Sequence, residues 1–262
     1  MSGGAPAGAR RPLSAVLIAR DEEQRIGACL ESLSFADEIV VVESGSTDRT
    51  VEIARRFTDK VVTLPWRGFG PQKRAAVALA SHDLVLNVDC DERVPPGLAA
   101  EIGALQAAPR LAAAYAIPRR TFIGEKEIRF CGWSPDRIVR LFDRTRAGFT
   151  DDLVHETVVA QGPVESCREA LLHHSFRGFG DLVLKLNRYS DLAARQMHER
   201  GRRPGALDAL RPVFAFARTY LLRLGFMDGF EGLEIAAADA LGTFAKYAKL
   251  RELERAARRG SR

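Results

Sequence analysis

Four short apolar runs in the N-terminal third, each followed by a change to another pattern, constrain the fold more than any other feature. The runs cover residues 13–19, 39–42, 61–64 and 84–88, and apolar residues at helical spacing occupy the segments between them. Continuous apolar runs of this length are typical of strands that are buried on both faces. Their alternation with helical segments, expected near 22–33 and 72–81, predicts parallel βαβ units and therefore an α/β sheet.

Acidic residues follow three of these runs. Asp89 and Asp91 come directly after residues 84–88, and Glu22 and Glu43 follow two earlier runs. Ligands of open α/β sheets bind outside the carboxyl ends of the strands, so these acids are expected at one crevice. On an extended strand end, Asp89 and Asp91 would point to the same side. Such oxygen ligands suit Mg²⁺ or Mn²⁺ shared with a phosphate, and a solvated acidic turn is the alternative.

After Asp91 the regular alternation of strands and helices ends. A helix is expected from about 95 to 107. Strand-like pieces that favour a mixed extension of the same sheet are expected at 113–118, 121–123, 127–130, 136–142 and 157–160. From about 179 the pattern is helical to the end. One helical stripe there is formed by Leu210, Val213, Phe214, Ala217, Tyr220, Leu221 and Leu224.

The positive charge is concentrated in this helical part. The chain carries a net charge of +5, but residues 177–262 contain 17 Lys/Arg and only 10 Asp/Glu. The helices either pack on the preceding domain or form a basic amphipathic surface for anionic lipid, with Phe216, Leu222 and Phe226 as apolar anchors. Three regions are therefore expected: a disordered N-terminus at 1–12, a catalytic domain at 13–176 and a basic helical region at 177–262.

Several classes of protein do not fit the sequence. No apolar run approaches the ~18–20 residues of a membrane span, and residues 1–12 lack the apolar core of a secretory signal. The four cysteines are too scattered for a metal motif or a disulfide framework, which favours a reduced, cytosolic setting. There is no Walker A motif, and the glycines at 68 and 70 lack the third glycine of a dinucleotide fingerprint. No nucleic-acid-binding motif is present.

The chain resembles the inverting family 2 glycosyltransferases of the GT-A fold. The resemblance rests on residues 17–22, 42–48, 72–75 and 89–92. Within that family it looks similar to the lipopolysaccharide core β-glucosyltransferases of the WaaE/KdtX type, on residues 136–142, 151–156 and 220–229. The likeness runs from about 13 to 250. It implies a GT-A, Rossmann-like nucleotide-sugar-binding sheet with a C-terminal helical extension.

The resemblance also implies roles for individual residues. Glu43, where family members usually have Asp, would contact the nucleotide base, and Asp89 would contact the ribose or diphosphate. Asp91 would bind a divalent metal, Mg²⁺ or Mn²⁺, and His155 would be a metal or diphosphate partner. The remaining residues assigned to the nucleotide-sugar site are Ala19, Glu22, Ser44, Lys73 and Cys90.

The reaction itself requires further groups. Negative charge develops on the nucleoside diphosphate as it leaves, and a metal with Lys or Arg can neutralise it. The acceptor hydroxyl needs a carboxylate base, for which Glu156 is the first candidate and Asp152, or its neighbour Asp151, the second. The pair at 173–174 supplies further imidazoles that could complete a metal site. Of Arg137 and Arg140, at most one is expected to face a phosphate.

These features together predict a metal-dependent transferase that moves a hexose, glucose from UDP-glucose, onto a lipid-linked saccharide such as lipopolysaccharide inner core. It would work in the cytoplasm, peripherally on the inner face of the cytoplasmic membrane and in contact with anionic lipid. A sugar-nucleotide pyrophosphorylase is one alternative. Such an enzyme would require a basic, Gly-rich loop after the first strand, whereas residues 20–23 are mainly acidic. A non-catalytic lipid- or saccharide-binding protein of the same fold is the other.

Overall fold

The computed structural model describes residues 10–134, 136–150 and 156–260. Contacts between residues divide the chain into two compact units. The first consists of Met1–Arg119 and Asp136–His173, and the second of Arg120–Pro135 and His174–Arg262. The domain boundary expected between residues 176 and 177 stays a prediction.

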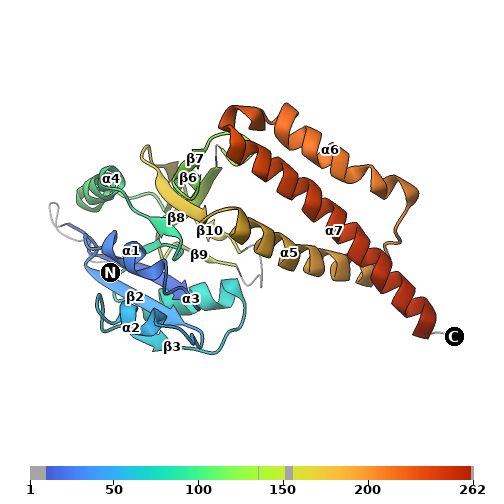
Figure 1. Cartoon of the computed structure of the whole chain (residues 1–262). Coiled ribbons are helices and arrows are strands. Elements are labelled where there is room, and N and C mark those ends of the chain that lie inside the picture. Colours follow the sequence, from blue (N-terminus) through green and yellow to red (C-terminus); the bar gives the residue numbers. More distant parts are fainter. Residues whose placement is uncertain (1–9, 135, 151–155, 261–262) are drawn as a thin grey trace. The chain divides into compact units, whose positions relative to one another are not determined.

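Four parallel strands form one part of the main sheet, in the order β3-β2-β1-β4. Figure 1 labels two of them, β2 and β3. The four strands are β1 (Leu13–Ala19), β2 (Glu38–Glu43), β3 (Val61–Thr63) and β4 (Leu84–Asn87). Each lies within one residue of the run that predicted it. The helices between them are α1 (Ile26–Glu31), α2 (Thr50–Ala54) and α3 (Phe69–Leu79). The predicted α/β class is therefore confirmed.

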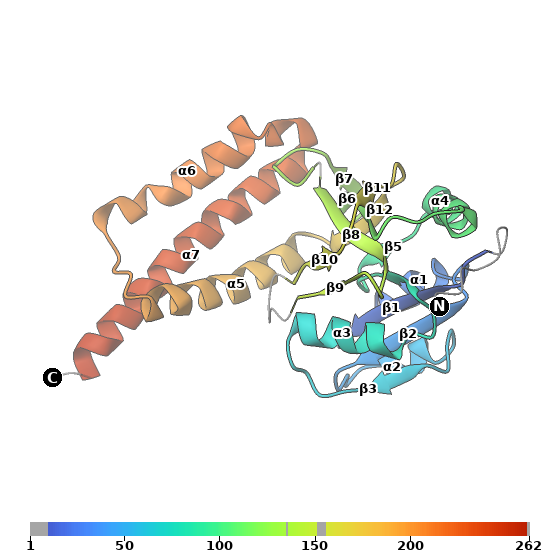
Figure 2. The same cartoon turned by 180° about the vertical axis from the view of Figure 1, so that it is seen from behind.

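Both faces of these strands are covered, which explains why they are apolar throughout. Leu13 and Leu17 of β1 belong to one buried cluster, together with residues of α1, α2 and α4 (Pro96–Ala107). Val16 belongs to a second cluster with Ala76 of α3. Alternate residues of one strand thus pack on opposite sides, and Figure 2 shows α3 over β1 and β2.

Antiparallel strands continue the sheet, as the mixed pattern after Asp91 predicted. β4 pairs with β8 (Asp136–Asp143), and β8 pairs with β6 (Ala114–Ile123). The two runs expected at 113–118 and 121–123 form this single strand, β6. β5 (Glu92–Arg93) pairs with β12 (Leu171–Phe176), while β11 (Val164–Ser166) runs parallel to β6. β9 (Ala147–Phe149) and β10 (Val158–Ala160) form a separate antiparallel pair.

The helical C-terminal region is confirmed in the second unit. Its main helices are α5 (Phe179–Glu199), α6 (Arg211–Ala217) and α7 (Phe230–Gly260), and both α5 and α6 pack along α7 (Figures 1 and 2). Shorter turns of helix connect them: η1 (Ala206–Ala209), η2 (Arg218–Leu222) and η3 (Gly225–Asp228). β7 (Lys126–Ile128) pairs with the end of β6. Buried Asp228 of η3 accepts hydrogen bonds from the amides of Arg129 and Phe130, just after β7, at 3.0 and 2.9 Å.

Much of the apolar stripe predicted around α6 lies on the surface. Large apolar side chains that are each more than half exposed occur from η1 to the start of α7: Leu207, Leu210, Val213, Phe214, Leu221, Leu222, Met227 and Phe230. Of the three predicted anchors, Leu222 and Phe226 are exposed and Phe216 is partly buried. This surface is named the α6 face below.

A glycine allows α7 to begin close to η3, and changing it should destabilise the second unit. A Cβ on Gly232 would fall well inside van der Waals contact with the carbonyl of Gly225. We expect Gly232→Ala to lower the free energy of unfolding by about 1–3 kcal/mol or more, the range for overpacked sites. Gly103→Ala in α4, where a Cβ would meet nothing within 4 Å, should instead raise it by about 0.5–1 kcal/mol. Urea titration of both variants checks this, and equal effects would contradict the close approach.

Candidate active site

The two aspartates after β4 lie in a turn and not on an extended strand end. The amide of Glu92 donates to the carbonyl of Asp89 (2.9 Å), and the amide of Asp89 donates to the carboxylate of Glu92 (2.9 Å). The prediction of an extended strand end, on which Asp89 and Asp91 would point to the same side, is therefore wrong. The turn directs the two carboxylates to different partners.

Asp89 lies between two cations. Its Oδ1 is 2.9 Å from Nζ of Lys73, and its Oδ2 accepts a hydrogen bond from the guanidinium of Arg140. Burial alone would raise the pKa of Asp89, but the charges of Arg140 and Lys73 outweigh it and hold this pKa well below its usual range. Asp89 is therefore a carboxylate at every physiological pH.

Lys73 connects Asp89 to the expected catalytic base. Its side chain projects from α3 and is 5% exposed, and its Nζ lies 2.8 Å from Oε1 of Glu156. Helix α3 begins after Gly68, which has φ of 108°, a conformation that glycine adopts at low cost. A single buried lysine thus joins two carboxylates that are far apart in sequence.

Arg140 is held by carboxylates and a side-chain amide oxygen. It donates to Oε1 of Glu92 (2.7 Å) and to Oδ1 of Asn87 (2.9 Å), besides Asp89. Glu92 is fully buried, and burial raises its pKa although the charge of Arg140 opposes this. Arg137 donates to the carbonyl of Cys167 (3.3 Å). The sequence alone assigned no role to Glu92 or Asn87, since both act by binding Arg140, which lies on strand β8.

Asp91 lies beside an imidazole. Its Oδ2 is 3.4 Å from Nε2 of His173, on β12. Burial raises the pKa of Asp91, but the hydrogen bond and charge of His173 outweigh it and keep the pKa below its usual value. His174 turns to another neighbour, the ring of Phe122, at 5.1 Å between centroids. Of the predicted pair at 173–174, one imidazole therefore reaches the acidic turn.

The donor set around Asp91 fits a divalent cation that is shared with a substrate. Mg²⁺ and Mn²⁺ at nucleotide sites commonly take one or two carboxylates and fill their remaining positions with phosphate and water. Within the described ranges no three His, Cys, Asp or Glu side chains are grouped to hold a metal by themselves. Asp91, with His173 next to it, suits the shared kind of site and not a closed protein cage.

The loop after β2 is organised by Glu43. Its Oε2 accepts hydrogen bonds from the amides of Gly45 and Ser46, both at 2.8 Å. Burial raises the pKa of Glu43, but these bonds, with one from Thr63, outweigh it and lower the pKa. Ser44 lies beside it, and its hydroxyl accepts from Nε2 of Gln72 (2.9 Å). Glu43 is a fixed carboxylate at the carboxyl end of β2.

The other expected nucleotide-site residues lie at the neighbouring end of β1. Ala19 is the last residue of β1, and its carbonyl accepts from the amide of Ser44 (3.1 Å). The amide of Glu22 donates to Oγ1 of Thr50 (2.7 Å). The thiol of Cys90 is buried in the core and donates to the carbonyl of Ile18 (3.4 Å), so only its backbone faces the turn. Because β1 pairs with both β2 and β4, these groups share one edge of the sheet.

Asp151, Asp152 and His155 lie outside the described residues, so their predicted roles as second base and metal partner stay predictions. Glu156 is the first described residue after that stretch. The geometry therefore gives one described candidate base, Glu156, one buried cation that reaches it, Lys73, and the acidic turn at 89–92.

Comparisons with known proteins identify a family and several similar proteins. The family model described as glycosyl transferase family 2 matches residues 14–162. An uncharacterized glycosyltransferase of Rickettsia bellii is 31% identical, over 93% of this chain and 87% of its own length. The lipopolysaccharide core biosynthesis glycosyltransferase LpsC of Rhizobium meliloti is 32% identical, over 91% of this chain and 92% of its own. Glucosyl-3-phosphoglycerate synthase from Mycobacterium tuberculosis, solved with Mg²⁺ and UDP, is 29% identical over 43% of this chain and 44% of that chain, with a TM-score of 0.33.

The family model covers more than half of this chain, and LpsC is similar along nearly all of it. The parallel strands β2, β3 and β4, all of β1 except Leu13, and the acids Glu43, Asp89 and Asp91 lie inside the matched range. The chain therefore belongs to glycosyl transferase family 2 and is a glycosyltransferase.

Proposed function

We propose that this glycosyltransferase inverts the anomeric carbon, requires a divalent metal, and moves glucose from UDP-glucose onto a lipid-linked saccharide such as lipopolysaccharide inner core. The observation that carries the reaction type is the continuous contact from Asp89 through Lys73 to Glu156. This contact joins Asp89, which is expected to bind the donor, to Glu156, whose carboxylate can accept a proton. The acceptor class is supported by the similarity to LpsC, a glycosyltransferase of lipopolysaccharide core biosynthesis.

On the donor side, negative charge must be neutralised as the diphosphate leaves. A bound Mg²⁺ or Mn²⁺ would supply Lewis-acid stabilisation of the diphosphate oxygens, and Asp91 with His173 would hold it. Glu43, fixed by the amides of Gly45 and Ser46, is suited to accept a hydrogen bond from the base of the nucleotide. Asp89, held by Lys73 and Arg140, is suited to accept from ribose hydroxyls.

On the acceptor side, Glu156 accepts the proton of the attacking hydroxyl. The hydroxyl oxygen forms the new bond to the anomeric carbon while the bond from that carbon to the diphosphate breaks. One displacement of this kind inverts the configuration. Lys73 keeps Glu156 oriented, because its Nζ lies within 3 Å of the carboxylates of both Asp89 and Glu156.

The donor assignment predicts a specific effect of Asp91→Asn. We expect UDP affinity in the presence of Mn²⁺ to fall at least tenfold, because the variant loses a charged metal ligand. EDTA should weaken UDP binding to the wild type by a similar factor and leave the variant almost unchanged. Isothermal titration with UDP, GDP, ADP and CMP, with and without Mn²⁺, measures both effects. Asp59→Asn, an exposed acid outside the site, is the matched control.

The possible outcomes separate the alternatives. An Asp91→Asn variant that transfers sugar as well as the wild type would refute the metal role. A preference for another nucleotide would keep the transferase and change the donor. Metal-dependent UDP binding without turnover on any saccharide acceptor would favour a binding protein of the same fold.

We further propose that the α6 face contacts an anionic membrane from the cytoplasmic side. In the described part of the chain no helix is long and apolar enough to cross a bilayer. The exposed apolar side chains of the α6 face lie in the region with the excess of basic residues, the combination found in helices that lie at a membrane surface. A surface of this kind would bring the enzyme to a lipid-linked acceptor.

Substitutions on the α6 face should weaken vesicle binding. We expect the double variant Phe214→Ser and Leu222→Ser to bind vesicles of phosphatidylglycerol and phosphatidylcholine at least tenfold more weakly, since both side chains lose apolar area that would enter the bilayer. Co-sedimentation measures this. Leu184→Ser with Leu192→Ser, which are exposed on α5, is the matched control. Equal losses in both double variants, or binding indifferent to phosphatidylglycerol, would rule out the α6 face as the contact.

A further inference from the structure

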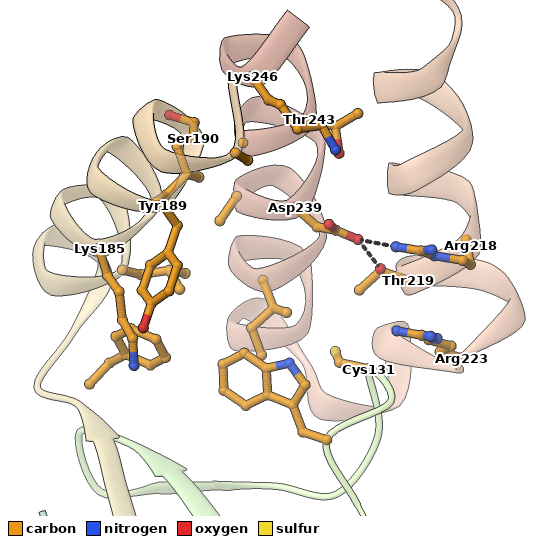
Figure 3. A pocket seen from close by; sticks show the side chains of 18 residues that line it. Cys131, Lys185, Tyr189, Ser190, Arg218, Thr219, Arg223, Asp239, Thr243 and Lys246 are labelled. Atoms are coloured by element: carbon orange, nitrogen blue, oxygen red, sulfur yellow. Dashed lines mark hydrogen bonds and ion pairs between the residues drawn. The ribbon is translucent and has the colours of Figure 1, made fainter. Parts of the chain in front are cut away.

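The second unit contains a cavity that none of the roles above uses. It lies among α5, α7 and the η2 segment, with the loop after β7 at one end, and has a volume of about 450 Å³ (Figure 3). All of its lining residues belong to the second unit. A volume of this size falls in the range of pockets that hold one small organic ligand, roughly 300–1,000 Å³.

The interior of the cavity is apolar. Trp133, Phe176, Leu182, Leu186 and Ile235 line it, and the same residues belong to or pack against the apolar core of the unit. The Trp133 and Phe176 rings lie 5.8 Å apart. Such walls favour hydrocarbon and offer few partners to the hydroxyls of a sugar.

Cations from three elements surround this apolar space. The lining contains four basic side chains and one acid, Asp239. The basic residues are Lys185 of α5, Arg218 of η2, Arg223 just after η2, and Lys246 of α7. Figure 3 shows Arg218 and Arg223 on one side and Lys185 on the opposite side. The cavity therefore carries an excess of three positive charges.

Asp239 does not neutralise all of them. Its Oδ2 accepts from Nη2 of Arg218 (3.0 Å) and from Oγ1 of Thr219 (2.7 Å). Among the residues that the structure describes, no carboxylate lies within ion-pair distance of Arg223 or Lys246, and the buried Nε of Arg218 has no acceptor. Unpaired guanidinium donors next to an apolar space are suited to a phosphate.

A glycine helps to fix one of these cations. Gly132 has φ of 80°, and a Cβ there would come within 3 Å of Nη1, Cδ and Cζ of Arg223. The arginine side chain thus lies directly against the glycine. The carbonyl of Arg223 also accepts from the amide of Cys131 (3.0 Å), so backbone and side chain are both held against the loop.

We propose that this cavity binds one anionic lipid molecule, with an acyl chain among Trp133, Phe176 and Leu186 and the lipid phosphate at Arg218 and Arg223. The occupant is a phosphate-bearing amphiphile from the membrane, taken up singly. Each methylene group that leaves water adds to the affinity, so a chain that fits the cavity supplies a large part of it. This site is independent of the donor, the metal and the base assigned above, and it needs no bilayer.

Dodecyl phosphate, below its critical micelle concentration, is a suitable probe. In full-length protein with Trp66→Phe, the fluorescence of Trp133 reports directly on the cavity, because the chain has only two tryptophans. We expect saturable binding of dodecyl phosphate, and at least tenfold weaker binding of both dodecyl maltoside and inorganic phosphate. The first comparison removes the charge of the head group, and the second removes the chain.

Two variants test the two halves of the site. Ala193→Phe should fill the cavity from α5, and Arg223→Gln should remove one phosphate donor, each weakening dodecyl phosphate binding at least tenfold. Ala256→Phe and Arg255→Gln, exposed on α7 outside the cavity, are the matched controls and should bind within twofold of the wild type. Thr243→Phe, which fills the cavity from α7, replaces Ala193→Phe if that variant melts at lower temperature.

The outcomes are decisive for this site. No saturable binding, or binding that Ala193→Phe and Thr243→Phe leave unchanged, would overturn the proposal, as would equal binding of dodecyl maltoside. UDP titration of the same variants should match the wild type. If the wild type does not bind UDP, that result would count against the proposed donor site. It would not affect the conclusion on lipid binding.

Discussion

Glu156→Gln should lower kcat for sugar transfer by about 10²- to 10⁴-fold, the usual contribution of a general base, and leave UDP binding within threefold of the wild type. The amide cannot take the proton of the acceptor hydroxyl. It can still accept a hydrogen bond from Lys73, whose Nζ lies 2.8 Å from the carboxylate in the native chain. The variant therefore removes the chemistry of Glu156 with little change to its contacts.

The measurement is a steady-state assay of transfer next to an isothermal titration with UDP. Glu165→Gln, an exposed glutamate on β11, is the matched control and should keep full activity. A Glu156→Gln enzyme that retains more than a tenth of the wild-type kcat would show that the base lies elsewhere. Asp152 would then be the next residue to change.

The sheet could be predicted because its strands carry a local signal. β1, β2 and β4 are continuous apolar runs, and each occupies almost the predicted residues. β5 has no such signal, since it consists only of Glu92 and Arg93 and exists because β12 pairs with it. The helix expected at 22–33 is shorter, Ile26–Glu31, because Asp21 takes a positive φ of 53° and a turn at Glu22 precedes the helix.

The sequence indicates candidate residues for the site but not the contacts that these residues make. Acids at strand ends identify Asp89 and Asp91 from the sequence, because parallel strands end at one edge. The partners come from distant segments: Lys73 from α3, Arg140 from β8 and His173 from β12. Periodicity reports which face a residue occupies and carries no information on which residue of another segment it meets. In the sequence, Arg140 cannot be distinguished from an exposed basic residue on a strand, because its burial is known only from the structure.

The second large effect is on stability. Arg140→Met should lower the free energy of unfolding by about 3–5 kcal/mol, because it removes the nearest cation from the fully buried Glu92. For a chain of this size the melting temperature should fall by about 10 °C. Arg56→Met, which breaks the exposed pair of Arg56 with Glu52, should change stability by less than about 1 kcal/mol. Thermal melting of both variants makes the comparison.

Adding Glu92→Gln to Arg140→Met should recover much of the loss. The glutamine is neutral and can still accept from the amide of Asp89, as Glu92 does at 2.9 Å. Residues in one buried network are not additive, so the double variant should be more stable than the sum of the two single changes. If both single changes simply add, Arg140 contributes through packing and not through its charge.

The pH dependence of Arg140→Met gives the sharpest test of this explanation. Burial already raises the pKa of Glu92, and Arg140 is the neighbour that opposes the rise. Without Arg140 the folded state binds a proton at Glu92 more tightly than the unfolded state does, so stability must fall as pH rises through the folded pKa.

The melting-temperature deficit of Arg140→Met should therefore be smaller near pH 5 than near pH 8. The part of this pH dependence that comes from Glu92 should be absent from the double variant, where position 92 cannot titrate. A deficit that stays constant in the single variant would mean that Glu92 finds another cation, and Arg119, whose Nη1 lies 3.7 Å from its Oε1, is the neighbour placed to supply it.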